Sequence, residues 1–279
     1  MTTPWLLSLL YRLEIGSACD AGRKRRDRRN EDAIGVVMPT FIKRHPPLLV
    51  VADGMGGHIG GALASHLVVK TIKDHYLHSW KHKDYLRLLE ECLHVAHQEI
   101  RSRASKHSQL TKMGSTVAVV IIDNNNLFMA NIGDSRIYLV SEQSIQQLSY
   151  DHSYVGELLR NNVLSPAQAR VHPQRSQLTM SISARRETIE PYMGQYKIGP
   201  KDIVVLCSDG LWGTISDAQI KAIVTDLPPQ AAADKLVAMT NASQGPDNIS
   251  VIIARQRSRG RKKGASDRDA ALDDTHPGY

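Results

Sequence analysis

The sequence predicts an α+β domain built from layers of helices and sheets. Strand-like segments come first, a pair of long helical segments follows, and a β-meander, further helices and a last strand complete the order. Strands and helices that occur in separate runs favour this class over a sheet of alternating β–α–β units. The chain contains no internal repeat that would suggest a solenoid.

Strand signals dominate residues 5–55, interrupted by a basic loop at 20–32. The apolar run Trp5–Leu10 is expected to form the first strand. It is much shorter than the ~20 residues that span a membrane, and it lacks the basic flank and cleavage site of a signal peptide. The sequence therefore predicts no membrane span.

The pattern becomes helical after Gly57. Apolar residues recur at intervals of three and four, which predicts two amphipathic helices of roughly 20 residues each, packed as a pair on a sheet. The residues that define the two stripes are Ala64, Val68, Ile72 and Tyr76 in the first helix, and Leu86, Leu89, Leu93, Ala96 and Ile100 in the second.

From Ser115 the strand pattern returns. A meander is expected over residues 116–122, 127–131 and 136–140, with a turn at 123–126. Residues 151–175 are predicted to form a helical insertion, because Ser165-Pro166-Ala167-Gln168 carries a capping box and a proline at the first helical position. Ser216 and Gln219 repeat the capping signal. Residues 231–241 are expected to form the last helix and 248–254 the last strand.

Length and composition indicate one domain. Of 279 residues, 42% are hydrophobic and 23% charged, which is usual for a globular protein. We expect a single domain over residues 1–255, with a disordered basic and acidic tail at 256–279. The three cysteines, Cys19, Cys92 and Cys207, show no CxxC spacing. A disulfide framework or zinc site is therefore not expected, and a reducing cytoplasm fits best.

The net charge of +7 is local. Basic residues concentrate in a loop at 23–29 and in a second cluster at 255–263; outside these clusters 23 basic and 27 acidic residues remain. Nucleic acid is therefore not an expected partner, although the high isoelectric point by itself suggests one. The second cluster lacks the interleaved aromatic residues of single-strand binding sites.

Carboxylates lie at the ends of several strand-like runs. Asp53 follows the apolar run 48–52, Asp209 follows 203–208, Asp247 precedes 249–253, and Asp32 precedes 33–37. A carboxylate in such a place is held by rigid backbone and still reaches solvent at the sheet edge. Several of them together form a cluster of oxygen ligands that suits Mg²⁺ or Mn²⁺ rather than zinc.

Six motifs, in order across about residues 13–255, resemble the protein phosphatase 2C family of metal-dependent Ser/Thr protein phosphatases. They are Asp20-Ala21-Gly22 with Asn30-Glu31-Asp32, Asp53-Gly54-Met55-Gly56-Gly57-His58, Gly114-Ser115-Thr116, Asn131-Ile132-Gly133-Asp134-Ser135-Arg136, Ser208-Asp209-Gly210-Leu211-Trp212, and Asp247-Asn248. The second motif, at residues 53–58, resembles the form found in the bacterial branch of that family. The resemblance implies a β-sandwich of two mainly antiparallel sheets flanked by helix pairs, a four-layer αββα arrangement.

The same resemblance implies the metal ligands. Asp53 would bridge two Mn²⁺ or Mg²⁺ ions and Gly54 would offer its carbonyl. Asp209 and Asp247 would hold one ion, and Glu31 and Asp32 the other or its waters. Asp134 would serve a third, weaker site together with Asp209. Two such cations can acidify a bridging water, so we expect single-step hydrolysis by a metal-bridging hydroxide.

Other site residues are less firmly indicated. His58 is expected either to act as an acid near the leaving oxygen or to pack at a helix N-terminus. The family's phosphate-binding arginine lies a few residues before the Glu-Asp pair, where this loop is longer. Arg26 is our first prediction for that role and Arg28 the second, because a guanidinium binds a phosphoryl group through two hydrogen bonds.

The sequence thus predicts a phosphoserine/phosphothreonine protein phosphatase that acts on substrates of a cognate Ser/Thr kinase, as a cytoplasmic monomer. The alternative is a pseudophosphatase that binds phosphoproteins without hydrolysis, which the altered arginine loop and Thr179-Met180-Ser181 favour slightly. The intact set Asp53, Asp209 and Asp247 favours the enzyme. Segment 153–175 matches the family's flap, either mobile or packed as a helical hairpin.

Overall fold

A computed structural model describes residues 13–40, 44–56, 58–243 and 245–256. The expected first strand at 5–10 and nearly all of the expected tail at 256–279 lie outside these residues. The strands are β1 (Leu13–Asp20), β2 (Asp32–Val37), β3 (Leu48–Met55), β4 (Gly114–Ser115), β5 (Val117–Asp123), β6 (Asn126–Ile132), β7 (Arg136–Val140), β8 (Ile145–Gln147), β9 (Ile182–Ser183), β10 (Tyr192–Lys197), β11 (Ile203–Cys207) and β12 (Ile249–Gln256).

The α-helices are α2 (His58–Ser79), α3 (Tyr85–Lys106), α4 (Tyr154–Arg160), α5 (Pro166–Arg170), α6 (Asp209–Trp212), α7 (Asp217–Asp226) and α8 (Pro229–Ala242). Short 3₁₀ turns occur at η2 (Arg23–Arg25), η3 (Trp80–His82) and η4 (Ser108–Leu110). Each helix of the long pair has 22 residues, close to the length that the apolar stripes predict. Both predicted capping boxes are formed, at Ser165 before α5 and at Ser216 before α7.

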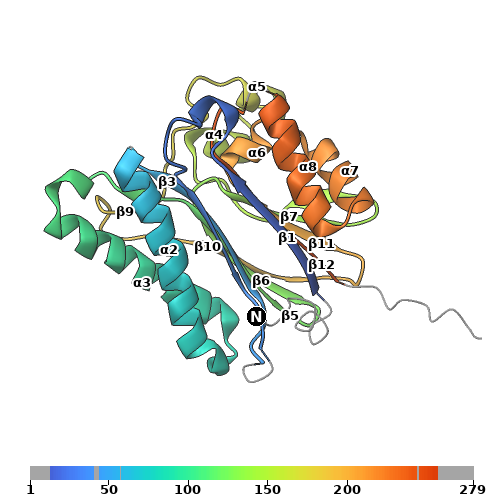
Figure 1. The fold of residues 1–279 in the computed structure, drawn as a ribbon, viewed down its shortest axis with the longest axis horizontal. Coiled ribbons are helices and arrows are strands. Elements are labelled where there is room, and N and C mark those ends of the chain that lie inside the picture. Colours follow the sequence, from blue (N-terminus) through green and yellow to red (C-terminus); the bar gives the residue numbers. More distant parts are fainter. Residues whose placement is uncertain (1–12, 41–43, 57, 244, 257–279) are drawn as a thin grey trace, which may run out of the picture.

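Two antiparallel sheets form the centre of the molecule. One has the strand order β1-β12-β11-β7-β8, and the other runs β10-β6-β5-β3-β4-β9 with β2 paired to β3. Figure 1 shows the pair α2 and α3 covering the outer face of the second sheet, and α7 and α8 covering that of the first. The four-layer sandwich that the resemblance implies is therefore confirmed.

Strand periodicity explains the layers. In β5, Val117, Val119 and Ile121 pack toward the α2–α3 layer, whereas Ala118 and Val120 pack between the two sheets. In β11, Val204 and Leu206 face the second sheet and their neighbours in the strand face α7 and α8. Such strands are buried on both faces, and each fully buried Val, Leu or Ile contributes about 1.5–3 kcal/mol relative to exposure.

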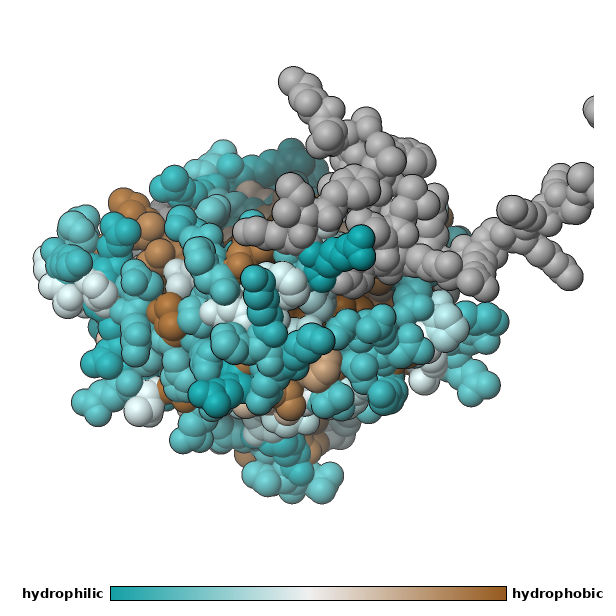
Figure 2. All heavy atoms as spheres, turned by 90° about the horizontal axis from the view of Figure 1, so that it is seen from below, coloured by the Kyte–Doolittle hydropathy of each residue, from teal (hydrophilic) through white to brown (hydrophobic). Residues whose placement is uncertain are grey.

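Loops and short helices concentrate at one end of the sandwich. The flap helices α4 and α5, helix α6 and the turn η2 all lie at the upper end in Figure 1. On the face seen in Figure 2, the visible described residues are mostly hydrophilic, with apolar residues in small scattered groups. Among the helices of the described ranges, none combines the length and apolarity needed to cross a membrane.

Candidate active site

Two predicted ligands stand opposite each other on neighbouring strands of the second sheet. Asp32 begins β2 and pairs in register with Asp53 of β3. The end of β3 is held further by Thr116, whose Oγ1 accepts from the Asp53 amide at 3.1 Å and whose amide donates to the Asp53 carbonyl at 2.8 Å. Like charges directly opposite each other destabilise a sheet, so this pairing calls for a compensating cation.

Three further carboxylates come from the first sheet. Asp209, two residues after the end of β11, is the first residue of α6, and Asp247 lies two residues before β12, the neighbour of β11. Asp134 lies in the turn between β6 and β7, and β7 pairs with β11 on its other side. Antiparallel pairing therefore brings chain positions far apart in the sequence to one end of the sandwich.

Hydrogen bonds join the ligands of the two sheets. Ser208 Oγ donates to Asp32 Oδ2 at 2.7 Å and accepts from the Ser250 amide at 3.0 Å. The nearby Asp209 carboxylate also raises the pKa of Asp53. The carboxylates of β2 and β3 thus meet those that follow β11, at the place where the two sheets come together.

Glu31 and Gly54 occupy a tightly packed corner. The Gly54 amide donates to the Glu31 carbonyl at 3.0 Å. A Cβ at Gly54 would lie 2.0 Å from the carbonyl oxygen of Gly61 in α2, and a Cβ at Gly61 would lie 2.9 Å from the Glu31 carboxylate. The backbone can approach this closely only where both side chains are absent. Glycines of the 54–61 segment therefore leave space for the Glu31 carboxylate beside Gly54.

The electrostatics of the cluster show strong mutual repulsion. Burial and the nearby carboxylates raise the pKa of Asp32 to about 7 and that of Asp209 to about 6. Burial also raises the pKa of Asp53 and Asp134 well above the ordinary value, with neighbouring aspartates adding to the shift. Buried carboxylates that repel each other in this way are relieved by bound cations.

The donor set fits hard divalent cations. Glu31 Oε1, Asp32 Oδ1 and Asp209 Oδ1 are buried oxygens without a hydrogen-bond partner, and buried polar atoms of this kind require an explanation such as a bound ion. Oxygen donors match Mg²⁺ or Mn²⁺. Within the described ranges, no three or more His, Cys, Asp or Glu side chains form a group that could hold a metal ion as they stand. Binding would therefore require side chains of the cluster to move.

Arg25 is the arginine that reaches the cluster. Its Nη1 lies 2.6 Å from Asp247 Oδ1 and its Nη2 donates to Asp247 Oδ2 at 2.8 Å. Arg26 and Arg28, the two predicted phosphate ligands, are exposed. The loop arginine that contacts the cluster is thus Arg25, and the phosphate-binding role of Arg26 or Arg28 stays a prediction.

The start of the loop explains the position of Arg25. Gly22 has φ 76°, and a Cβ there would lie 1.9 Å from the Asp247 carbonyl oxygen. The Arg25 amide then donates to the Gly22 carbonyl at 3.1 Å. The position of Arg25 is therefore fixed by the turn at Gly22, two residues after the end of β1.

Asp134 borders a cavity of about 380 Å³ between the metal-ligand cluster and the flap. The flap contributes apolar side chains, including Val155 and Leu159, and the cluster contributes Asp209 and Asp247. Residues 153–175 form two short helices closed by a bridge between Ser153 and Leu178. The predicted helices of this segment are therefore confirmed, and they lie beside the candidate site.

Two further residues near the site are His58, which was predicted, and Asn248, which was not. His58 is the first residue of α2; its side chain is outside what the structure describes, and its role stays a prediction. Sequence reasoning missed Asn248, whose Oδ1 accepts from the Glu31 amide at 2.9 Å while its Nδ2 donates to the Ala21 carbonyl at 2.9 Å. Its place directly after Asp247 in the last motif was the available signal.

Comparisons with known proteins agree with this geometry. Residues 20–247 match the protein phosphatase 2C family. Protein phosphatase PhpP of Streptococcus pneumoniae is 33% identical over 258 residues, which cover 86% of this chain and 96% of that protein. The crystal structure of the serine/threonine phosphatase PstP/Ppp of Mycobacterium tuberculosis has a TM-score of 0.79 at 28% identity, covering 88% of this chain and 99% of that one.

A second crystal structure, of the PstP catalytic domain in complex with two manganese ions, has a TM-score of 0.76 at 27% identity and covers 87% of this chain and 97% of that one. The family match covers most of the sequence, and the curated relative matches nearly end to end. The chain therefore belongs to the protein phosphatase 2C family, as its motifs indicated.

Proposed function

We propose that this protein is a Mg²⁺- or Mn²⁺-dependent phosphatase of phosphoserine and phosphothreonine in proteins. The observation that carries the proposal is the cluster of buried carboxylates from both sheets, with unpartnered oxygens on Glu31, Asp32 and Asp209. The serine/threonine phosphatases to which the chain is similar, one of them crystallised with two manganese ions, support the substrate class and the metal.

Each candidate ligand would have its own role. Asp53 would serve both cations, and Gly54 would offer its carbonyl. Asp209 and Asp247 would hold one cation, and Glu31 and Asp32 would hold the other or its waters. Asp134 with Asp209 would form a weaker third site. When bound, the two cations would supply an acidified water and neutralise phosphate charge. Arg25 would bind the phosphoryl oxygens through its planar fork.

Hydrolysis would proceed in one step, without a phosphorylated enzyme. A covalent route through cysteine requires a thiolate. Burial raises the pKa of Cys92 to about 12 and raises that of Cys207 further. These two thiols are buried and remain protonated at neutral pH, so they are poor nucleophiles.

The test is hydrolysis of para-nitrophenyl phosphate and of a phosphothreonine peptide with Mn²⁺, with Mg²⁺ and with EDTA. We expect turnover only with metal, and a loss of at least about 10²-fold in Asp209→Asn. Asp226→Asn, an exposed position at the end of α7, is the matched control and should retain activity. Folded protein without turnover under either metal would favour the pseudophosphatase instead.

Several finer points stay predictions from the sequence. These are a cognate Ser/Thr kinase, a monomeric state, a cytoplasmic location and a single domain over residues 1–255.

A further inference from the structure

Arg136 is a partly buried arginine at the centre of a network of contacts beside the carboxylate cluster. Its Nε donates to both carboxylate oxygens of Asp151 at 3.1 Å, its Nη2 donates to Asp151 Oδ2 at 2.7 Å, and its Nη1 donates to Tyr138 Oη at 2.9 Å. The two side chains of the ion pair are 14% and 9% exposed. A fork-shaped ion pair of this kind fixes orientation as well as charge.

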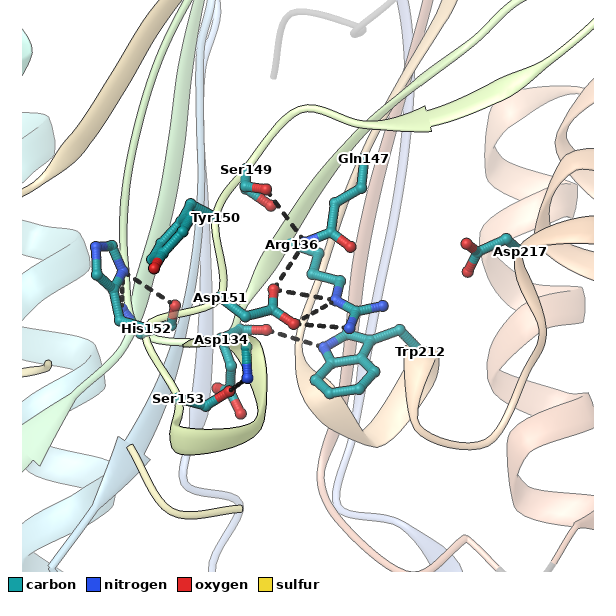
Figure 3. Close-up of polar contacts among 12 residues, drawn as sticks. Asp134, Arg136, Gln147, Ser149, Tyr150, Asp151, His152, Ser153, Trp212 and Asp217 are labelled. Carbon is teal, nitrogen blue, oxygen red and sulfur yellow. Dashed lines mark hydrogen bonds and ion pairs between the residues drawn. The ribbon is translucent and has the colours of Figure 1, made fainter. Parts of the chain in front are cut away.

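The guanidinium of Arg136 also stacks on Trp212. Its central carbon lies 3.6 Å from the centre of the indole ring, a cation–π arrangement that favours arginine over lysine. Trp212 is the last residue of α6, the short helix that begins with Asp209. The indole Nε1 donates to the main-chain carbonyl of Asp134 at 2.9 Å. Figure 3 shows the indole between the Arg136 guanidinium and the Asp134 carbonyl.

The contact network around Arg136 also includes the residues just before the flap. His152, next to Asp151, donates its amide to the Gly133 carbonyl at 2.9 Å, and the Gly133 amide donates to His152 Nδ1 at 3.2 Å. The Asp134 turn is therefore held from both sides. Asp151 and His152 also directly precede Ser153, which caps α4 with an acceptor bond from the Gly156 amide at 3.1 Å.

We propose that Arg136 and Trp212 are positioning residues that hold the Asp134 carboxylate in place for a divalent cation and connect its position to the flap. The inference rests on the proposed metal-binding role of Asp134. The contact network would act through the backbone at Asp134 and through α6, which begins with Asp209. Partners of this indirect kind commonly change metal affinity by about 10–100-fold when they are removed.

A purely structural role would give a different result. If the contact network only filled space, replacing Trp212 would lower stability and affect all cation sites alike. If it positions Asp134, the effect must disappear once the Asp134 carboxylate is absent. A double-mutant cycle separates the two cases.

The experiment measures Mn²⁺ bound per chain by the electron paramagnetic resonance signal of free Mn²⁺. The variants are Trp212→Phe, which keeps an aromatic ring but removes the indole donor, Asp134→Asn, and the two combined. Trp80→Phe, a tryptophan of η3 packed near His45, is the matched control. Arg136→Lys keeps the charge without the fork and replaces Trp212→Phe if that variant does not fold.

We expect Trp212→Phe to raise the dissociation constant of the most weakly bound ion about tenfold and to have no further effect in Asp134→Asn. Equal weakening in both backgrounds, or none in the wild-type background, would overturn the inference. Asp134→Asn that binds Mn²⁺ like the wild type would overturn it as well. That last outcome would leave the proposed phosphatase function standing, because Asp209→Asn tests that function separately.

Discussion

At the scale of single residues, the candidate site is defined by carboxylates that repel one another. Asp32 and Asp53 form a cross-strand pair, and Asp209 and Asp247 come from the neighbouring sheet. Asp32 is buried, and Asp53 and Asp209 are half-buried, so their charges are poorly hydrated. A protein without bound cations should therefore reveal this repulsion in its stability.

The first prediction concerns pH. In EDTA, the free energy of unfolding contributed by Asp32 and Asp209 should fall as the pH rises from about 4 to 7. An ordinary aspartate has a pKa of about 3.9, whereas the folded value is raised to about 7 for Asp32 and to about 6 for Asp209. The folded state therefore binds more protons than the unfolded state in this window, and stability decreases as those protons are lost.

Urea unfolding at pH 5.0 and 7.5 measures this effect by comparing the wild type with Asp32→Asn. The variant should lose less stability over that interval, and added Mn²⁺ should stabilise the wild type more at pH 7.5 than at pH 5.0. Identical pH dependence of the two proteins would contradict the account.

The second prediction concerns the arginine loop. Arg25→Ala should raise the KM for a phosphothreonine peptide about tenfold, because an Arg–phosphate fork is lost. Arg26→Ala and Arg28→Ala, exposed in the same loop, are the controls and should stay within about twofold. A larger KM change in Arg26→Ala than in Arg25→Ala would restore our prediction from the sequence.

The positions of the candidate site residues were predictable where a motif fixed the spacing, and less so in the arginine loop. Asp53, Asp209 and Asp247 lie at strand ends as the apolar runs indicated. We predicted Arg26 by counting back from Glu31. Counting forward from Gly22 leads to Arg25, whose amide bonds to the Gly22 carbonyl and whose side chain pairs with Asp247.

At the scale of secondary-structure elements, long periodic segments were predicted well and short ones poorly. The helices at 58–79 and 85–106 follow from apolar spacing, and the capping boxes at Ser165 and Ser216 mark true helix starts. Strands β4 and β9, of two residues each, and the four-residue helix α6 have no sequence period to reveal them. They exist because of pairing with distant segments, as Gly114 pairs with Ser183.

The third prediction tests the packing of α8 on β1. A Cβ at Gly16 of β1 would lie 2.1 Å from the backbone of Pro229 in α8, so Gly16→Ala should destabilise the protein by about 1–3 kcal/mol through overpacking. Gly60→Ala in α2 is the control. Its Cβ would have no neighbour closer than 3.6 Å, and alanine favours a helix over glycine by about 0.5–1 kcal/mol. Urea unfolding that ranks the two variants in the opposite order would contradict this packing.

At the scale of the whole molecule, the site depends on both sheets at once. The second sheet supplies Asp32 and Asp53, and the first supplies Asp209 and Asp247, with Ser208 bonded across the junction. The order of elements predicted an α+β class but not the sandwich, because pairs such as β1 with β12 join the two ends of the described chain. The resemblance to a family supplied that information.

The fourth prediction concerns the C-terminal region. A chain that ends at Gln256 should fold and hydrolyse para-nitrophenyl phosphate at the wild-type rate. Strand β12 ends at Gln256, and every proposed ligand and both sheets lie within the described residues. Circular dichroism and a metal-dependent rate assay check this, and a truncated chain that is unfolded would contradict it.

The central claim is that carboxylates from both sheets hold the cations on which phosphothreonine hydrolysis depends. The most direct measurement follows Mn²⁺ bound per chain and turnover of a phosphothreonine peptide in the same titration, for the wild type and for Asp209→Asn. We predict that turnover appears only as at least two ions bind per chain, and that the variant loses both an ion and activity. Turnover that persists in EDTA, or in Asp209→Asn at wild-type rate, would contradict the account.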